Sequence, residues 1–333
     1  MQKVTQAQLV SRARQLLDDG TVSRVLGWRR GDFSYDVTPA VFSDTGALER
    51  DFVFDVFCCA NLSKYLIREA NNDSKGKTLI FLKPCDSYAF NALLTEHRFD
   101  REKVYAIGIS CGGMMDVHTT NALSPDGITG AECEGDTLVL HTLYDGDRSY
   151  PLPDVLPERC RTCGHGHAAD CDEWMACEKT EPDEHPARYS AVDTLETMTE
   201  EERFAFWQEA FSRCIRCNAC RDVCPVCTCE KCVFDNPKSG LENKAAADLF
   251  EEQMFHIIRA YHVTGRCVDC GECSRVCPQR IPLHLLNRKM ILDINRSWGA
   301  YTAGAEVGQR FPLVDYRTDD PEASVRADGR DDK

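Results

Sequence analysis

The sequence CIRCNACRDVCP at residues 214–225 and its counterpart CVDCGECSRVCP at residues 267–278 decide the organisation of this chain. Both have the spacing CxxCxxCxxxCP, in which three closely spaced cysteines are followed by a fourth cysteine and a proline. Thiolate sulfur is a soft ligand, so cysteines grouped this closely indicate metal chemistry. Because the two stretches share every cysteine position, we expect them to form one pseudo-symmetric unit.

Zinc and disulfides are the alternatives for any group of cysteines. A structural zinc ion takes four ligands from two CxxC pairs, whereas here the cysteines come in threes. The chain begins with MQKVTQAQLVSRARQLL, an amphipathic segment without the continuous apolar core of a signal peptide, so we expect a cytoplasmic protein with reduced thiols. The 20 cysteines therefore indicate metal ligands, and oxygen-sensitive clusters would suit an anaerobic organism.

The spacing is typical of bacterial ferredoxins with two 4Fe-4S clusters, in which the fourth cysteine of each run binds the other cluster. The ligands predicted for the first cluster are Cys214, Cys217, Cys220 and Cys277. Those predicted for the second cluster are Cys267, Cys270, Cys273 and Cys224. A pair of clusters that exchange ligands is better explained as a path for electrons than as a brace for the fold, so we predict electron transfer.

Composition limits the possible partners. A formal charge of −15 and a pI near 5.1 repel phosphate backbones, so nucleic acid is not expected to bind. Apolar residues make up 43% of the chain, which is enough for two domain cores. No stretch approaches the roughly 18 consecutive apolar residues of a membrane-spanning helix. We therefore expect a globular protein without direct membrane insertion.

The first half of the sequence predicts an α/β domain. KTLIFLK and KVYAIGIS, within residues 77–110, are apolar runs typical of buried strands, and the helical pattern between them has a candidate cap at Asp86 or Ser87. A strand, a helix and a strand in this order predict a βαβ unit with parallel strands. Cys85 and Cys111 would then lie at the carboxyl ends of neighbouring strands, where open α/β sheets place ligands.

A CxxC at Cys160 and Cys163 supplies two further candidate ligands, and Cys171 is a rival for the fourth position. By spacing alone, this CxxC with His165 and His167 is equally consistent with zinc. The predicted strand ends favour a cluster, because a rigid sheet would fix two cysteines and the loop with the CxxC would close over them.

The second half of the sequence predicts a mainly helical region around the two runs. Thr199 and Glu202 form a capping box for a helix that leads into Cys214. The 42 residues between Cys224 and Cys267 include another helical pattern, which could cover one cluster. We expect an α/β (α+β) domain with a short parallel βαβ core over residues 1–195, a two-cluster ferredoxin-like domain over residues 196–300 and a charged, disordered tail over residues 301–333.

KTLIFLKPCDSYAFNALL and KVYAIGISCGGM, followed about 50 residues later by a CxxC, resemble the coenzyme F420 hydrogenase and formate dehydrogenase beta-subunit family. FWQEAFSRC and the two cysteine runs resemble its dicluster members, which serve beside formate dehydrogenases or in flavin oxidoreductase and heterodisulfide reductase assemblies. The resemblance covers roughly residues 50–295. It implies a third 4Fe-4S cluster held by Cys85, Cys111, Cys160 and Cys163. Many relatives have ADI where this chain has AADCDEWMAC, which leaves the fourth ligand open.

The resemblance also implies a flavin, because the family carries one. Gly112 and Gly113 follow a predicted buried strand and would let a phosphate of FAD approach backbone amides, although a GG pair is also an ordinary turn. The sequence contains no GxGxxG.

The sequence CPVCTCEKC extends the first run by three cysteines whose role stays open. They are either part of a further metal site, with Cys177 as a possible partner, or buried thiols beside the second cluster. The three are Cys227, Cys229 and Cys232.

We predict an iron-sulfur electron-transfer subunit of a soluble oxidoreductase complex. It would relay single electrons between a flavoprotein or formate-oxidising partner and a heterodisulfide-reductase-like or ferredoxin acceptor. The sequence has no P-loop, nucleophile elbow or HExxH motif. The alternative is an FAD-dependent subunit that oxidises reduced F420 or a reduced nicotinamide and passes electrons to its own clusters. A zinc-braced scaffold is a third class.

Overall fold

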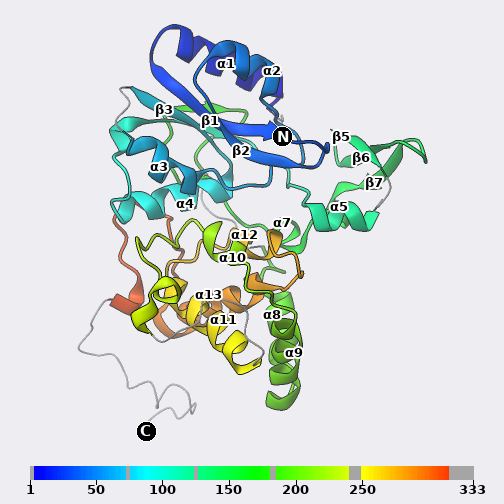
Figure 1. Cartoon of the computed structure of the whole chain (residues 1–333), viewed down its shortest axis with the longest axis vertical. Helices are drawn as coiled ribbons and strands as arrows, with labels where there is room; N and C mark the ends of the chain where they lie inside the picture. Colours follow the sequence, from blue (N-terminus) through cyan, green and yellow to red (C-terminus); the bar gives the residue numbers. More distant parts are fainter. Residues whose placement is uncertain (1–3, 73–75, 124–126, 181–184, 240–248, 315–333) are drawn as a thin grey trace.

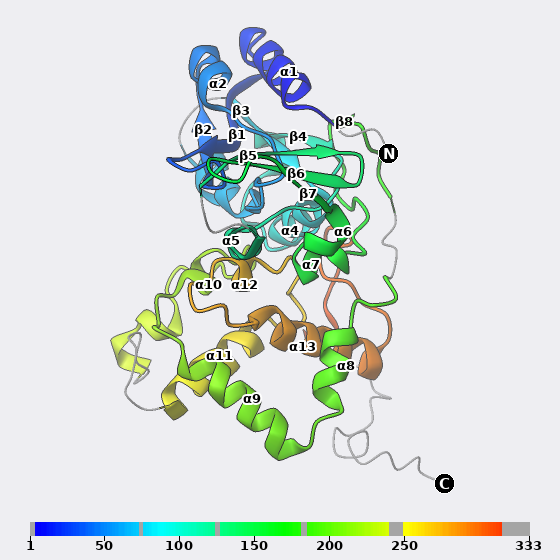
Figure 2. The ribbon, with the colours of Figure 1, turned by 90° about the vertical axis from the view of Figure 1, so that its right-hand side faces the viewer.

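The computed structural model describes residues 4–72, 76–123, 127–180, 185–239 and 249–314 (Figure 1). A layered sheet domain occupies one end of the molecule and a group of helices occupies the other (Figures 1 and 2). The short helices that carry the cysteine runs lie between these two parts. The structure therefore has the predicted fold class, an α/β domain followed by a mainly helical region.

A five-stranded sheet with the order β2-β1-β3-β4-β8 forms the centre of the first part. Only the pairing of β1 with β2 is antiparallel, whereas β1–β3, β3–β4 and β4–β8 are parallel. The strands are β1 (Val22–Arg30), β2 (Val37–Phe42), β3 (Lys77–Leu82), β4 (Val104–Ile109) and β8 (Glu173–Met175). The parallel pair predicted for the βαβ unit, β3 with β4, is confirmed.

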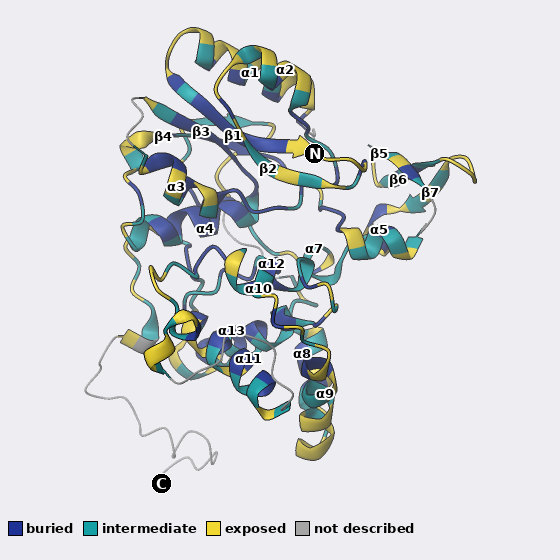
Figure 3. Ribbon diagram, viewed as in Figure 1, coloured by how far each residue is buried: buried dark blue, intermediate teal, exposed yellow. Residues whose placement is uncertain are grey.

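Helices cover both faces of this sheet, which explains why β3 and β4 are buried along almost their whole length (Figure 3). On one side lie α1 (Gln6–Asp18) and α2 (Thr45–Asp51), and on the other lie η1 (Ser63–Tyr65), α3 (Leu66–Ala70) and α4 (Pro84–Thr95). The core between them includes Trp28, Phe81 and Phe90. The connection from β3 through α4 to β4 includes the turn η2 (Arg101–Lys103).

Helix α4 begins three or four residues earlier than the sequence predicted. Pro84 is its first residue, and a proline there has a backbone angle already suited to a helix. The predicted cap at Asp86 or Ser87 is therefore wrong, since both residues lie inside the first turn. Cys85 consequently lies in the first turn of α4, while Cys111 follows the end of β4.

Residues 151–198, which lack a clear sequence period, contain several short elements. They are α6 (Leu152–Val155), α7 (Glu158–Arg161), β8 and α8 (Ser190–Glu196). Before them lies a separate antiparallel sheet with the strand order β5-β6-β7. That sheet and the helix before it comprise α5 (Val117–Leu123), β5 (Ile128–Glu134), β6 (Thr137–Thr142) and β7 (Arg148–Pro151).

The helical part follows the sequence prediction closely. The capping box of Thr199 and Glu202 starts α9, and the predicted helix between the two cysteine runs is present as α11. The elements are α9 (Glu200–Ser212), α10 (Ala219–Asp222), η3 (Val233–Asp235), η4 (Pro237–Ser239), α11 (Leu249–Val263), α12 (Glu272–Arg275), α13 (Leu283–Trp298) and η5 (Pro312–Val314). In the described ranges, no helix is both long and apolar enough to cross a membrane.

Residues 301–314, at the start of the predicted tail, pack against α4. The Nδ2 group of Asn91 donates a hydrogen bond to the carbonyl oxygen of Gly304 at 3.0 Å. The amide of Gly308 donates to Thr95 Oγ1 at 2.9 Å. The rest of the predicted tail, residues 315–333, lies outside the described residues.

Candidate iron-sulfur sites

The two cysteine runs form loops with the same backbone pattern. The second residue after the first cysteine has a positive φ in both runs, 50° at Arg216 and 53° at Asp269. The fourth residue also does, with 61° at Asn218 and 69° at Gly271. Three of these four are not glycine, so each loop maintains an unfavourable conformation at equivalent places. The predicted pseudo-symmetry is therefore present in the backbone.

These conformations turn backbone amides toward cysteine sulfur. The amide of Arg216 lies 3.4 Å from Cys214 Sγ. Burial raises the pKa of the Cys214 thiol to about 11, and this amide acts in the opposite direction. In the second run, burial raises the pKa of Cys267, and the amide of Asp269 opposes that effect. Amides aimed at sulfur stabilise a thiolate, so the loops fit the sulfur ligands of a cluster.

The four cysteines predicted for the first cluster line one small cavity. It contains the first three cysteines of the first run together with the last cysteine of the second run: Cys214, Cys217, Cys220 and Cys277. Phe255 and His256 of α11 and Leu283 of α13 complete its wall. The predicted exchange of the fourth ligand therefore corresponds to the way the chain folds, and the thiol set fits a 4Fe-4S cluster.

The cysteines predicted for the second cluster are also neighbours. Cys224 lies close enough to Cys267, Cys270 and Cys273 to influence the pKa of each thiol, after the larger effect of burial. A hydrogen bond from Cys227 lowers the pKa of Cys224 to about 6.

The structure also brings together the third set of predicted ligands. Burial raises the pKa of Cys85, and the thiols of Cys163 and Cys111 add to this effect. Burial likewise raises the pKa of Cys111 to about 12, with contributions from Cys160 and Cys163. Helix α4, the end of β4 and the α7 loop thus supply four thiols to one place.

Lys83 provides a buried positive charge beside this third set. Its side chain is 1% exposed, and its Nζ atom lies 3.1 Å from a carboxylate oxygen of Asp86. The same atom donates hydrogen bonds to the carbonyl oxygens of Cys58 at 3.0 Å and Ala60 at 3.1 Å. Asp86, Cys85 and Cys111 are the charges that raise the pKa of Lys83 against burial. A fixed cation next to four thiols favours their thiolate form.

The third set adjoins the second run through His165. The Nε2 atom of His165 donates to the carbonyl oxygen of Val268, and its Nδ1 atom lies beside Cys163 Sγ. A buried ion pair of 3.3 Å between Arg159 and Glu272 connects the same two segments. Two of the three cysteine sets are therefore joined by direct contacts between their loops.

The rival ligand Cys171 lies elsewhere. A Cβ added at Gly108 of β4 would come within 3.2 Å of Cys171 Sγ, which places this thiol against the strand. Its pKa is raised to about 12 by burial and also by Cys177. His167 donates to the carbonyl oxygen of Leu82 at 2.8 Å. In the described ranges, no three His, Cys, Asp or Glu side chains are arranged to hold a single metal ion.

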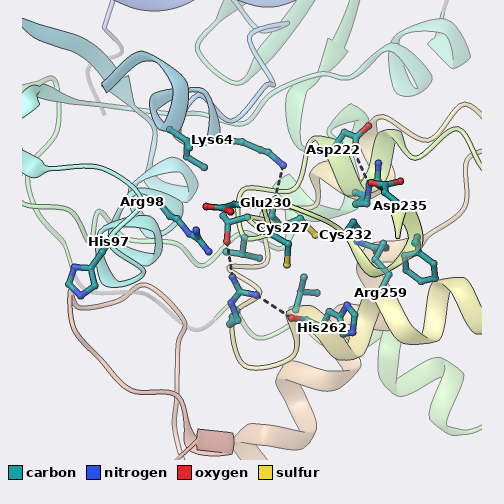
Figure 4. Close-up of a pocket in the computed structure, with 18 of the residues that line it drawn as sticks. Lys64, His97, Arg98, Asp222, Cys227, Glu230, Cys232, Asp235, Arg259 and His262 are labelled. Carbon is teal, nitrogen blue, oxygen red and sulfur yellow. Dashed lines mark hydrogen bonds and ion pairs between the residues drawn. The ribbon is translucent and has the colours of Figure 1, made fainter. Parts of the chain in front are cut away.

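The additional thiols of the first run line a larger cavity of about 690 Å³ between the sheet domain and the helices (Figure 4). They are Cys227, Cys229 and Cys232. Cys227 donates to Cys224, so it acts on a predicted ligand. The cavity also contains Lys64 and Arg259. No sequence motif indicated this cavity, because its wall combines residues from distant parts of the chain.

Gly112 and Gly113, the predicted contacts of a flavin, follow strand β4, and Gly113 is closely packed there. Gly113 has a φ of 99°, and a Cβ on it would approach Leu156 Cδ1 to 2.6 Å. Its amide also acts on the sulfur of Cys111. Gly112 is exposed. A glycine is thus required at position 113 by the turn and its packing.

Comparisons with known proteins agree with this site. Residues 209–281 match the 4Fe-4S dicluster domain. The chain is similar to the F420-dependent formate dehydrogenase subunit beta of Methanocaldococcus jannaschii, with 25% identity over 350 aligned residues that cover 88% of this chain and 90% of the relative. It is also similar to the F420-dependent formate dehydrogenase 1 subunit beta of Methanococcus maripaludis, with 23% identity, covering 66% of this chain and 72% of the relative.

Among solved structures, the chain is similar to a chain of the F420-reducing NiFe hydrogenase complex from Methanosarcina barkeri. The identity is 12% and the TM-score is 0.38, and the match covers 49% of this chain and 64% of the other.

The cysteine loops and the dicluster match define an iron-sulfur protein with a role in electron transfer. More particularly, the chain contains a 4Fe-4S dicluster domain and is similar over most of its length to a beta subunit of an F420-dependent formate dehydrogenase.

Proposed function

We propose that this chain is the relay subunit of an oxidoreductase complex and holds three 4Fe-4S clusters in a row. The third set of cysteines, Cys85, Cys111, Cys160 and Cys163, binds the cluster of the sheet domain. The two runs bind the other two clusters with exchanged fourth ligands. The observation that carries the proposal is the contact of His165 with both Cys163 and Val268, because it joins the sheet-domain set to the second run.

The proposed order follows from these contacts. The sheet-domain cluster is next to the cluster of Cys224, Cys267, Cys270 and Cys273. That cluster is next to the one in the cavity with Cys277. A single electron can thus pass between the two ends of the molecule through neighbouring clusters. The backbone amides and Lys83 stabilise the thiolates that bind them.

The proposed partners are inferred from the names of the relatives. Two relatives are beta subunits of F420-dependent formate dehydrogenases, so we propose a formate-oxidising or flavin-bearing subunit at one end of the relay. A heterodisulfide-reductase-like protein or a ferredoxin would exchange electrons at the other end. The whole complex is proposed to work in the cytoplasm of an anaerobic organism.

Iron and acid-labile sulfide, measured on anaerobically purified protein, test the proposal together with low-temperature EPR of the reduced form. Three clusters correspond to about twelve iron atoms per chain, and two clusters to about eight. We expect about twelve iron atoms and an equal amount of sulfide. A value of about eight would overturn the third cluster, and zinc without sulfide would overturn the whole proposal.

The second candidate is a catalytic subunit that binds FAD near Gly112 and Gly113 and oxidises reduced F420 or a reduced nicotinamide. The names of the two relatives favour it, since both are F420-dependent. Reduction of a dye by reduced F420 or NADH with this chain alone, together with flavin released on denaturation, would establish it. If no flavin is released and no dye is reduced, the second candidate is excluded and the relay function remains.

A further inference from the structure

Helix α11, which belongs to the segment between the two cysteine runs, lies against the cluster sites. It packs on α9 and α13 (Figure 2). Glu252 near its start forms a 2.9 Å ion pair with Arg216 of the first run. His256 and Arg259 follow on the same helix, and residues three apart share a face of a helix. The helix therefore presents two nitrogen-bearing side chains toward the cysteines.

Arg259 is a buried cation without a carboxylate partner among the described residues. It is 2% exposed, and none of its three guanidinium nitrogens has an oxygen acceptor in that part of the chain, whereas its side chain contacts the thiol of Cys273. Burial lowers the pKa of Arg259, and the thiols of Cys273, Cys220, Cys224 and Cys227 oppose this effect, in that order. The first three of these thiols come from both cysteine runs. The guanidinium thus lies between the two predicted clusters, at the wall of the large cavity (Figure 4).

A buried guanidinium whose N–H donors meet only thiols is costly, unless negative charge and stronger acceptors compensate it. Neutral thiols compensate it poorly. A 4Fe-4S cluster provides acceptors of the right kind, because its sulfur atoms carry negative charge and accept hydrogen bonds. The position of Arg259 is therefore favourable when clusters occupy both sites.

His256 lies at only one of the two predicted cluster sites. It is 1% exposed, both of its ring nitrogens lack a partner among the described residues, and it lines the cavity with Cys277. Its ring stacks on Phe211, with 4.5 Å between centroids. An imidazole ring has an N–H group that can donate to a sulfur atom of a cluster in this cavity. It can act on the first cluster alone.

We propose that Arg259 sets the reduction potentials of both clusters of the ferredoxin-like unit, whereas His256 acts only on the cluster held by Cys277. Each cluster gains one electron and one negative charge on reduction, with no proton taken up by either side chain. A fixed positive charge and its N–H donors stabilise this added charge, which raises the potential. A cation shared by two clusters also reduces the repulsion between them when both are reduced.

The inference rests on one part of the proposed function, namely that the two runs hold two clusters. Iron and sulfide in the wild-type protein test that point first and separately. The experiment is then an EPR-monitored redox titration of anaerobically purified, iron-replete protein. The variants are Arg259→Met, Arg259→Gln, Arg259→Lys and His256→Phe. The matched control is Arg213→Met, since Arg213 adjoins Cys214 in sequence but is exposed and paired with Glu209.

For Arg259→Met we expect both clusters to become harder to reduce. The equilibrium constant for one-electron reduction should fall at least tenfold for each, which corresponds to about 59 mV per tenfold change. Arg259→Lys should recover most of the shift. His256→Phe should shift one cluster only, and Arg213→Met neither.

Unchanged potentials in iron-replete Arg259→Met would overturn the proposal, as would an equal shift in Arg213→Met. If Arg259→Met does not retain iron, Arg259→Gln, which keeps a donor without the charge, is titrated instead and should again lower both potentials. Loss of iron from both neutral variants, with wild-type potentials in Arg259→Lys, would assign Arg259 to cluster assembly and overturn its role in the potentials.

Discussion

The Nε2 atom of His165 lies 3.0 Å from the carbonyl oxygen of Val268. Val268 stands between the first two cysteines of the second run, and His165 is the second residue after the CxxC of the sheet domain. One side chain thus connects a loop of the sheet domain with a loop of the helical region. The two parts of the chain meet at their cysteines, and this is the geometry that a relay needs.

Replacing Cys85 by serine should remove the sheet-domain cluster while leaving the other two. We expect iron to fall from about twelve to about eight atoms per chain. Cys171→Ser is the matched control and should retain about twelve, because Cys171 packs against β4 and not with Cys111. The reverse pattern, with iron lost from Cys171→Ser only, would make Cys171 the fourth ligand. Iron analysis of both proteins gives the answer.

Lys83→Met should destabilise the protein strongly, because it leaves the carboxylate of Asp86 buried without its partner. Breaking one side of a buried ion pair costs about 3–5 kcal/mol. Lys83→Met combined with Asp86→Asn should lose less than the first change alone, since no unpaired charge then remains. Anaerobic denaturant unfolding of the wild-type protein, both single variants and the double variant measures this. Independent, additive losses would show that the pair is not coupled.

Gly271→Ala should destabilise the protein by more than the same change at Gly20. Both glycines have positive φ, 69° and 74°, so alanine adds backbone strain of about 1–2 kcal/mol at either place. At Gly271 the new Cβ would also clash with Arg159 Cδ, whereas nothing lies within 4 Å of it at Gly20. Thermal midpoints of the two variants measure the difference. Equal losses would mean that Arg159 can move aside without cost.

The stability of the protein should decrease in mild acid because of His167. Burial lowers the pKa of His167 to about 4, from an ordinary value of 6.5. The unfolded chain therefore binds a proton that the folded chain excludes, so stability is complete above pH 6.5 and decreases as the pH falls to about 4. Between pH 6.5 and 5.5 the expected loss is about 1 kcal/mol.

The variant that checks this is His167→Gln, which keeps a donor for the carbonyl oxygen of Leu82 and removes the titration. Denaturant unfolding at several pH values should give a flatter profile for the variant than for the wild-type protein. Parallel profiles would assign the acid sensitivity to other groups.

The sequence allowed prediction of those features that depend on local pattern. The capping box at Thr199, the buried strand Lys77–Leu82 and the helix between the runs all follow from short-range signals, and all are present. The start of α4 was missed because Pro84 was not recognised as its first residue. Strand β8 was missed because three residues carry too little periodicity, and only its pairing with β4 defines it.

In the candidate site, too, features that depend on local pattern were predicted and those that depend on tertiary folding were not. Spacing alone predicted which cysteines belong to the two runs, and the cavity with Cys277 agrees with the exchange of ligands. Spacing could not reveal that His165 contacts Val268, that Lys83 acts on Cys111 or that Arg259 acts on thiols of both runs, because these relationships depend on tertiary folding. Arg259 lies within an ordinary amphipathic helix pattern, and nothing in that pattern distinguishes it from a surface arginine.

The cavity lined by Cys214, Cys217, Cys220 and Cys277 also has a consequence for the biosynthesis of the protein. Three of its thiols are followed by the helix α11 that forms its wall, and the fourth comes from the end of the second run. During translation this pocket cannot close until that last cysteine has left the ribosome. Since metal binding and folding are coupled in such sites, a cluster bound by these four cysteines could be inserted only after Cys277 has been translated, although Cys214, its first ligand, is made much earlier.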